Sequence, residues 1–282
     1  PAGDAVIPVE LEVDVAPVGA YRLPTAGRDG VLLAQGGALI RAVGTAVVRA
    51  WVTGGAVRLR AEAPTREVGL VAIERMRFAL GTDHDLGEFQ RRFRRDPLIG
   101  PVIRRRPWLR PRRRPEPFEA LAWAVCEQLI EGRRASAIER KIVRRLGSRT
   151  GAHCYPPSAE RVARLAPAEL DACGLAPKRS IALIRAAREV ASGRADLSRH
   201  EPSWRRLKAI PNIGNWTIEM LAFEGQGRDD MLPALDLAYV KLVGVLAGLG
   251  RRATEDEVRD FFAPYEEHAA LAGIYALHRR YL

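Results

Sequence analysis

The sequence predicts an α+β N-terminal domain followed by an all-α helical bundle, and two patterns indicate this fold class. Apolar and polar residues alternate in valine-rich stretches over roughly the first 80 positions, as in half-buried strands. After Asp85 apolar residues recur at helical spacing, between prolines, glycines and capping residues that begin or end helices. We therefore expect an α+β domain at residues 1–85 and a helical domain at residues 86–282.

The N-terminal domain is expected to combine strands with one helix. The strands are predicted in VIPVELEVDV (6–15), ALIRAVGTAVVRAWV (38–52) and AVRLRAEA (56–63), with TGG as a hairpin turn between the last two. The stretch EVGLVAIERMRFALG (67–81) has the spacing of a helix that packs on one face.

The helical domain shows a series of start and stop signals. An apolar stripe of Phe118, Leu121, Val125 and Leu129 follows Pro115 and Pro117, and a second stripe ends at Gly147. Further helices are indicated by Ser158, by Pro167 with Gly174, by residues 178–192 before Gly193, and by the capping pair Thr254 and Glu257.

Charge and composition favour an anionic partner. The 282 residues carry 45 Lys and Arg against 34 Asp and Glu, a net charge of +11, which suits nucleic acid or a membrane surface. No apolar run approaches the roughly 20 residues that cross a bilayer, and the first residues show no export signal. We expect a soluble cytoplasmic protein, associated with the nucleoid and not with a membrane.

The cysteines give no sign of a metal or disulfide framework. Cys126, Cys154 and Cys173 are an odd number without a CxxC pair, and three thiols cannot complete an ordinary iron–sulfur site. The adjacent His153 and Cys154 are better interpreted as a loop histidine beside a buried thiol than as ligands.

A hairpin between two helices is predicted at IPNIGNW (210–216). Trp204, Leu207 and Ile210 mark the buried side of the first helix, and Trp216, Met220 and Phe223 that of the second. Pro211 ends the first helix, and Gly214 is expected to adopt a backbone conformation that a side chain would oppose. This helix-hairpin-helix at residues 203–225 would present backbone N–H groups to a phosphate, although an ordinary tight turn between packed helices has the same pattern.

A second motif follows at LPALDLAYVK, within an element at residues 233–248. Pro233 precedes Asp236 by three residues, and Asp236 opens the next helix. An aspartate in this place is expected to cap the helix, and a cap holds the carboxylate in position while one oxygen faces outward.

Together these motifs resemble the helix-hairpin-helix, Gly/Pro, Asp superfamily of DNA glycosylases. DPLIGPVIRRRPWLR, PFEALAWAVCEQLI and PALDL are similar to its AlkA-type branch, the 3-methyladenine DNA glycosylases II, from roughly residue 75 onwards. The resemblance implies a glycosylase that flips alkylated purines, such as 3-methyladenine and 7-methylguanine, out of duplex DNA and leaves an abasic site.

The resemblance also implies roles for particular residues. Asp236 would stabilise the positive charge that develops on the sugar, and Trp216 stands where the lyase members have a nucleophilic lysine, so a monofunctional enzyme is expected. The implied substrate pocket comprises Trp216, Met220, Trp123 and Tyr275, the last of these with His278 on the final helix. The implied DNA contacts are Gln128, Leu129, Lys178, Arg179 and the hairpin residues Pro211, Asn212, Ile213, Gly214 and Asn215.

Leu129 would be the wedge that fills the gap in the DNA, but its periodicity equally suits packing in the core. The carbonyl groups of Ile210 and Ile213 would hold a Na⁺ or K⁺ ion, and no cofactor is required. The expected partner is double-stranded DNA with damaged bases, bound by a monomer.

Two features leave alternatives open. Residues 91–115 contain eleven arginines against Asp96 alone, and this run could follow DNA phosphates or form a salt-bridged connector. Glu127 and Glu131 replace glycine and serine of the family around the inserting turn, and Glu219 precedes Met220 where an aromatic residue is usual. The rival functions are therefore a helix-hairpin-helix protein that binds DNA without cleaving it, or a glycosylase for another lesion such as hypoxanthine, bulky adducts or mismatched adenine.

Overall fold

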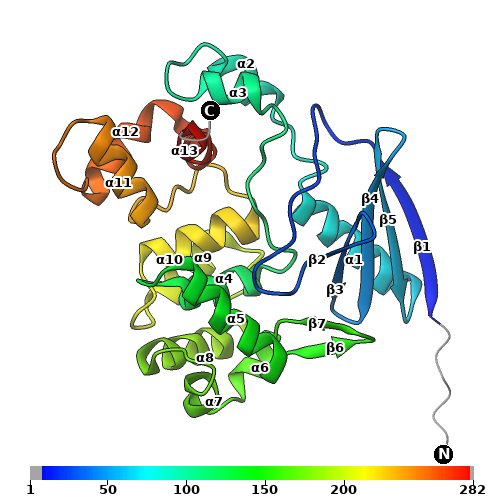
Figure 1. The fold of residues 1–282 in the computed structure, drawn as a ribbon. Helices are drawn as coiled ribbons and strands as arrows, with labels where there is room; N and C mark the ends of the chain where they lie inside the picture. The colour runs from blue at the N-terminus through cyan, green and yellow to red at the C-terminus, as the bar shows by residue number, and fades with distance from the viewer. Residues whose placement is uncertain (1–7, 280–282) are drawn as a thin grey trace, which may run out of the picture.

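The computed structural model describes residues 8–279, and it confirms the α+β domain followed by helices. The N-terminal part is an antiparallel sheet in the order β1-β5-β4-β3-β2. Its strands are β1 (Val9–Val15), β2 (Leu33–Gln35), β3 (Ala38–Val43), β4 (Ala46–Thr53) and β5 (Ala56–Ala63). Helix α1 (Arg66–Leu80) lies against this sheet at the right of Figure 1.

The alternation in the sequence explains how this domain is held together. Every second residue of β5 is buried, and these side chains form one core with Ala72, Ile73, Met76 and Leu80 of α1. The helix begins at Thr65, whose side chain accepts a hydrogen bond from Val68 N, and it ends at Gly81 with φ 67°. The predicted helix therefore lies in the expected place.

The rest of the chain is mainly helical. Its elements are α2 (Gly87–Phe93), α3 (Gly100–Arg105), α4 (Pro117–Glu127), α5 (Gly132–Leu146), α6 (Ala159–Ala163), α7 (Pro167–Asp171), α8 (Pro177–Ala191), α9 (His200–Lys208), α10 (Asn215–Met220), a π-helical turn η1 (Leu221–Gly225), α11 (Leu237–Leu246), α12 (Glu255–Phe262), a 3-10 turn η2 (Ala263–His268) and α13 (Ala269–His278). None of the helices in the described part of the chain combines the length and apolar character that a bilayer crossing requires.

The helices form two groups, which Figure 1 shows above and below each other. One apolar core joins α2, α3, α11, α12 and α13. Two further cores join α4 to α10, with α4 contributing to both. The chain passes from the first group to the second through the connector at residues 106–116. It returns to the first group after η1, so two segments join the groups.

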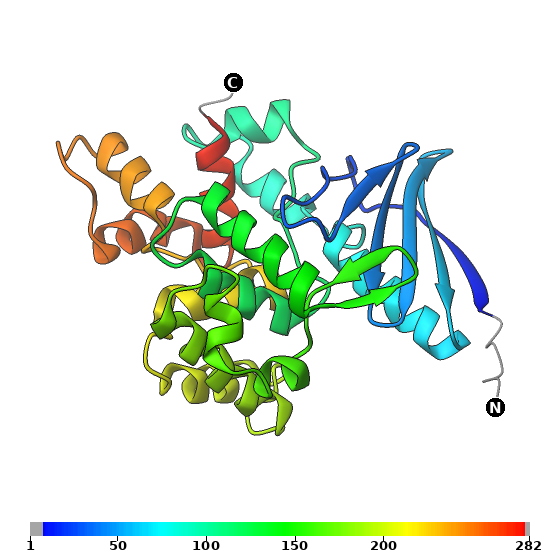
Figure 2. The ribbon, with the colours of Figure 1, turned by 60° about the horizontal axis from the view of Figure 1, so that its bottom comes forward.

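A short β-hairpin lies within the helical part and was not predicted. Strands β6 (Ser148–Thr150) and β7 (His153–Tyr155) pair with each other and extend toward the sheet (Figure 2). The Thr150 hydroxyl donates a hydrogen bond to the carbonyl oxygen of Gly44 at 3.2 Å, which joins the hairpin to the β3–β4 turn. His153 and Cys154 thus lie in a strand rather than in a loop.

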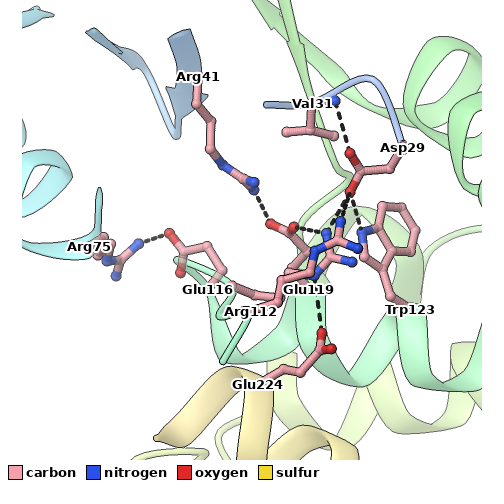
Figure 3. A network of polar contacts seen from close by, with 10 residues as sticks. Asp29, Val31, Arg41, Arg75, Arg112, Glu116, Glu119, Trp123 and Glu224 are labelled. Carbon is pink, nitrogen blue, oxygen red and sulfur yellow. Dashed lines mark hydrogen bonds and ion pairs between the residues drawn. The ribbon is translucent and has the colours of Figure 1, made fainter. Parts of the chain in front are cut away.

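Buried ion pairs also join the two parts of the molecule. Asp29, on the loop between β1 and β2, pairs with Arg114 of the connector at 2.5 Å, and Arg41 of β3 pairs with Glu119 of α4. Arg114 also contacts Glu119 and Glu224, each at 3.3 Å. Figure 3 shows these side chains converging between the sheet and α4. Glu224 is partly exposed, whereas the other charges are buried but paired, which is the condition under which buried charges are tolerated.

Candidate active site

A cleft of about 1800 Å³ lies where the two helical groups and the N-terminal part meet. Its walls come from the loop at residues 22–29, the connector at residues 108–114, the α4–α5 turn, the hairpin and the start of α11. The predicted catalytic aspartate, the hairpin and the inserting turn therefore border one space, although they are distant in sequence.

Asp236 is held at the edge of this cleft by two hydrogen bonds. Its Oδ1 accepts the backbone N–H of Ala238 at 2.8 Å, so it caps α11 as the sequence predicts. Its Oδ2 accepts the indole N–H of Trp216 at 3.3 Å. No ion pair to Asp236 occurs within residues 8–279, and the side chain stays partly exposed, so its negative charge faces the cleft without a permanent counter-ion.

Trp216 lies in the predicted pocket, but the other three predicted pocket residues do not line the cleft. Trp123 is 1% exposed and donates its indole N–H to Asp29 at 3.2 Å. Tyr275 is fully buried, and its hydroxyl donates to the carbonyl oxygen of Leu109. Met220 is partly buried outside the cleft. The resemblance pointed to residues that face inward here but did not separate the core from the cleft. On α13 it is His278 that borders the cleft.

The hairpin has the predicted shape with a different backbone detail. The left-handed residue is Asn212, with φ 70°, whereas Gly214 is extended with φ −103° and ψ −172°. Asparagine tolerates the left-handed region better than most residues, so the turn does not depend on the glycine for its conformation. A Cβ on Gly214 would meet no heavy atom within 4 Å, which leaves the space above the start of α10 open.

The α4–α5 turn exposes Leu129 completely. Leu129 is 103% exposed with φ 55°, so the alternative that it packs in the core is wrong. The preceding Gln128 points back, and its side-chain amide donates to the carbonyl oxygen of Asn212 and to the Thr217 hydroxyl, both at 2.8 Å. The turn is thereby fastened to the hairpin.

Comparison with known proteins finds DNA glycosylases that are similar to this chain. The chain is 29% identical over 205 residues to the DNA-3-methyladenine glycosylase of Bacillus subtilis, covering 68% of this chain and 67% of that enzyme. It spans about half the length of the fission-yeast and Escherichia coli relatives named DNA-3-methyladenine glycosylase 1 and 2, 54% and 51% respectively. No protein-family model matches the chain.

Solved structures agree with these relatives. The 3-methyladenine DNA-glycosylase of Archaeoglobus fulgidus superposes with a TM-score of 0.79 at 19% identity, covering 96% of this chain and 99% of that one. The Schizosaccharomyces pombe 3-methyladenine DNA glycosylase, solved with abasic DNA, superposes with a TM-score of 0.57 at 25% identity, covering 67% of this chain and 93% of that one. In sequence and fold the chain is similar to the AlkA-type DNA glycosylases. The chain is an enzyme of the DNA-3-methyladenine glycosylase type, an N-glycosyl hydrolase with DNA as its partner.

In this glycosylase the first turn of α8 supports the α4–α5 turn. Arg179 donates to the carbonyl oxygens of Cys126 and Gln128, at 3.1 and 2.9 Å, where the end of α4 leaves carbonyl groups without helical partners. Lys178 beside it is exposed. Arg179 thus holds the turn in shape, a role that its charge alone did not reveal.

The arginine run divides into two parts. Arg113 and Arg114 are buried and ion-paired, and Arg110 donates to the carbonyl oxygens of Val18 and Ala20, so this part of the run is a connector. Arg112 is half exposed and lies in the cleft wall. The earlier part of the run lies on and after α2, where Arg92 pairs with Glu266 and Glu267 on η2. Other arginines in that part are exposed.

Three acidic residues depart from the family pattern, and they lie in different surroundings. Glu219 is buried and pairs with Arg259 of α12, outside the cleft. Glu131 is exposed at the cleft, and Glu127 is partly exposed there. Burial raises the pKa of Glu127, as do the carboxyl groups of Glu224 and Glu139, against the opposing effect of Arg114 and Arg112.

Sequence patterns did not identify several other residues that line the cleft. Leu235 and Leu237 flank Asp236 and are each 50% exposed. The loop at residues 22–29 contributes a wall, although its sequence carries no periodic signal. The sequence shows only that a leucine stands on each side of the capping Asp236, which does not indicate that either is exposed.

Proposed function

We propose that this glycosylase is monofunctional and excises alkylated purines, of the 3-methyladenine and 7-methylguanine type, from double-stranded DNA. The observation that supports this proposal best is the hydrogen bond between Trp216 and Asp236 at the cleft. The carboxylate of Asp236 can face positive charge that develops on the sugar. The indole of Trp216 cannot form a Schiff base with that sugar. The names of the relatives support the choice of alkylated purines.

Asp236 would act on the sugar of a flipped nucleotide. Loss of an alkylated base leaves positive charge on the sugar ring, and a fixed carboxylate stabilises that charge more than it stabilises the uncharged ground state. The bonds from Ala238 and Trp216 fix the two oxygens before the substrate arrives. A carboxylate has about four lone-pair positions, so both oxygens can still face the sugar or a water molecule.

Trp216 would also bind the base. A purine alkylated at N3 or N7 is cationic, and an indole face attracts cations. Such a base leaves readily, so the proposed reaction on this class of lesion requires no proton donor. After the base departs, water adds to the sugar and leaves an abasic site.

The hairpin and the α4–α5 turn would grip the DNA. Backbone N–H groups at the start of α10 suit a phosphate, and the open space at Gly214 allows close approach. Leu129 would enter the space left by the flipped nucleotide, with Gln128 beside it and Lys178 near the backbone. We also propose that the carbonyl groups of Ile210 and Ile213 bind Na⁺ or K⁺. The Ile210 oxygen accepts Ile213 N–H at 3.0 Å and keeps a second lone pair for an ion.

We propose a monomer that works where the DNA is, in the cytoplasm. A damaged base has no two-fold symmetry that a dimer could match. The net charge of +11 favours association with DNA.

The proposal is tested by incubating methylated duplex DNA with wild type and with Asp236→Asn. Wild type should release 3-methyladenine and 7-methylguanine. Asp236→Asn keeps an oxygen that can cap α11 but removes the charge, and release should fall by at least about 100-fold. Equal release by the two proteins, or no release by wild type, refutes the proposal.

Borohydride trapping tests the monofunctional assignment separately. A lyase forms an imine with the sugar, which borohydride reduces to a stable protein–DNA adduct. We expect no adduct with wild type under conditions in which a lyase of the superfamily is trapped, and an adduct would contradict the role given to Trp216.

A further inference from the structure

Glu127 borders the same cleft as Asp236, and the proposed mechanism does not use it. It is the last residue of α4, where the helix dipole disfavours negative charge, whereas Asp236 caps the start of α11, where the dipole favours it. The next residue, Gln128, donates to Thr217, and Thr217 follows Trp216 in the chain. The turn that follows Glu127 is therefore fastened to the start of the helix that holds Trp216.

The surroundings of Glu127 favour its protonated form. Its charged neighbours are Glu139 on α5, Glu224 on η1, and Arg112 and Arg114 on the connector. Arg114 is already engaged by Asp29, Glu119 and Glu224. The carboxyl groups around Arg114 outnumber the cations available to them, so the state of lowest free energy carries a proton on one carboxyl group.

Glu139 identifies where that proton is shared. Glu139 is 2% exposed, and its Oε1 has no hydrogen-bond partner among the described residues. Its side chain lies within hydrogen-bonding reach of Glu127, and burial raises the pKa of both groups. Two carboxyl groups can hydrogen-bond each other only when one of them is protonated.

We propose that Glu127, sharing a proton with Glu139, is the general acid that protonates uncharged damaged purines as they leave. This inference rests on the proposed function and extends it from cationic bases to neutral ones. A neutral purine is a poor leaving group, and protonation of its ring removes that disadvantage. The same cleft then contains two carboxyl groups with different roles. Asp236 acts on the sugar, and the protonated Glu127 acts on the base, because their surroundings differ.

The step is balanced as follows for hypoxanthine. The proton passes from the Glu127 carboxyl oxygen to N7 of the base. The bond between C1′ and N9 breaks, its electron pair stays on N9, and hypoxanthine leaves as the neutral N7–H form. Water then adds to C1′ beside Asp236, and the proton that it loses restores the Glu127–Glu139 pair.

The test uses two duplexes that differ only in the lesion, hypoxanthine or 7-methylguanine, under single-turnover conditions. Wild type should excise both. Glu127→Gln has nearly the same shape but cannot act as the acid, and the ratio of the hypoxanthine rate to the 7-methylguanine rate should fall by about 100-fold or more. The 7-methylguanine rate of the same variant also reports whether it folds.

Glu131→Gln is the matched control, because it makes the same substitution in the wall of the same cleft without touching the shared proton. Its effect should be equal for the two lesions, to within about threefold. In wild type the hypoxanthine rate should decline as the pH rises from about 6 to about 9, while the 7-methylguanine rate does not follow it. Glu139→Gln, which changes a positioning residue, should move the midpoint of that decline.

The contradicting results are distinguishable. Release of 7-methylguanine without hypoxanthine by wild type overturns the general acid and leaves the proposed function intact. An equal loss on both lesions in Glu127→Gln also overturns it, since the residue would then only shape the cleft. Release of neither lesion overturns the proposed function and, with it, this inference.

Discussion

The molecule contains two tryptophan–aspartate pairs that make the same hydrogen bond in different surroundings. Trp216 donates to Asp236 at 3.3 Å at the edge of the cleft, and Trp123 donates to Asp29 at 3.2 Å between the sheet and α4. Asp29 is 1% exposed and paired with Arg114, whereas Asp236 is partly exposed and has no counter-ion within the described residues. An indole N–H therefore leaves a carboxylate available for chemistry in one place and helps to join two domains in the other.

The largest effect is expected from breaking the buried pair. Arg114→Met leaves Asp29, Glu119 and Glu224 without their shared cation, and we expect a loss of about 3–5 kcal/mol in the free energy of unfolding, measured by urea denaturation. Arg112→Met is the matched control, because Arg112 approaches the same Asp29 at 3.7 Å from an exposed position. It should cost at most about 1 kcal/mol. Equal losses would show that the burial of Arg114 does not matter.

Exchanging the two indoles for phenyl rings tests the comparison directly. Trp216→Phe removes a hydrogen bond to a reactive carboxylate, which should slow excision of 7-methylguanine by about 10- to 100-fold in single-turnover assays. Trp123→Phe removes one of the two donors to Asp29 Oδ2, the other being Arg114, and should lower the free energy of unfolding by about 1–3 kcal/mol, with excision retained. The comparison fails if either variant shows the phenotype expected of the other.

Two leucines of one segment extend the contrast between cleft and core. Leu129→Ala shortens a fully exposed side chain, so stability should change by at most about 0.5 kcal/mol while excision falls by about 10-fold. Leu121, on α4, is 0% exposed, and Leu121→Ala should instead cost about 2–5 kcal/mol. Thermal unfolding and excision measured on the same samples separate these outcomes, and a strong loss of stability in Leu129→Ala contradicts the exposed position.

The smallest effect concerns pH. Because burial raises the pKa of Glu139, the folded state binds a proton more tightly than the unfolded state, and stability falls as the pH rises from the ordinary carboxyl range to the raised value. Glu139→Gln removes this contribution. Relative to wild type it should gain about 1 kcal/mol between pH 5 and pH 8, measured as the difference in free energy of unfolding. A difference that does not change with pH would contradict the shared proton.

Local motifs predicted much of the fold and the centre of the site. The hairpin, the cap at Asp236 and the helix ends are determined by neighbouring residues, so the sequence contains the signals that place them. Burial is determined by elements that are distant in sequence. Trp123, Tyr275 and Met220 were therefore assigned to the pocket for the same reason that Trp216 was, and only the packing of α4, α10 and α13 separates them.

Other features could not be predicted because their signals are weak or depend on partners. SRTGAHCY lacks the apolar alternation of a strand, so the β6–β7 hairpin was missed. Gly214 was expected in the left-handed region that Asn212 occupies, because glycine is the more common residue there. The arginine run showed its charge but not its carboxylate partners, so the sequence could not separate Arg113 and Arg114 from the exposed members.

The hydrogen bonds of Arg179 and Gln128 to the α4–α5 turn bear on the proposed insertion of Leu129 into DNA. Leu129 projects in a backbone conformation that most residues avoid, and three side-chain N–H contacts to carbonyl oxygens keep it there in the absence of DNA. A turn that is already ordered before DNA binds loses little conformational entropy at each encounter. Testing an undamaged base pair with Leu129 would therefore cost little free energy. In the proposed mechanism, a weakly stacked nucleotide would leave the duplex when Leu129 enters it, whereas a well-stacked nucleotide would stay.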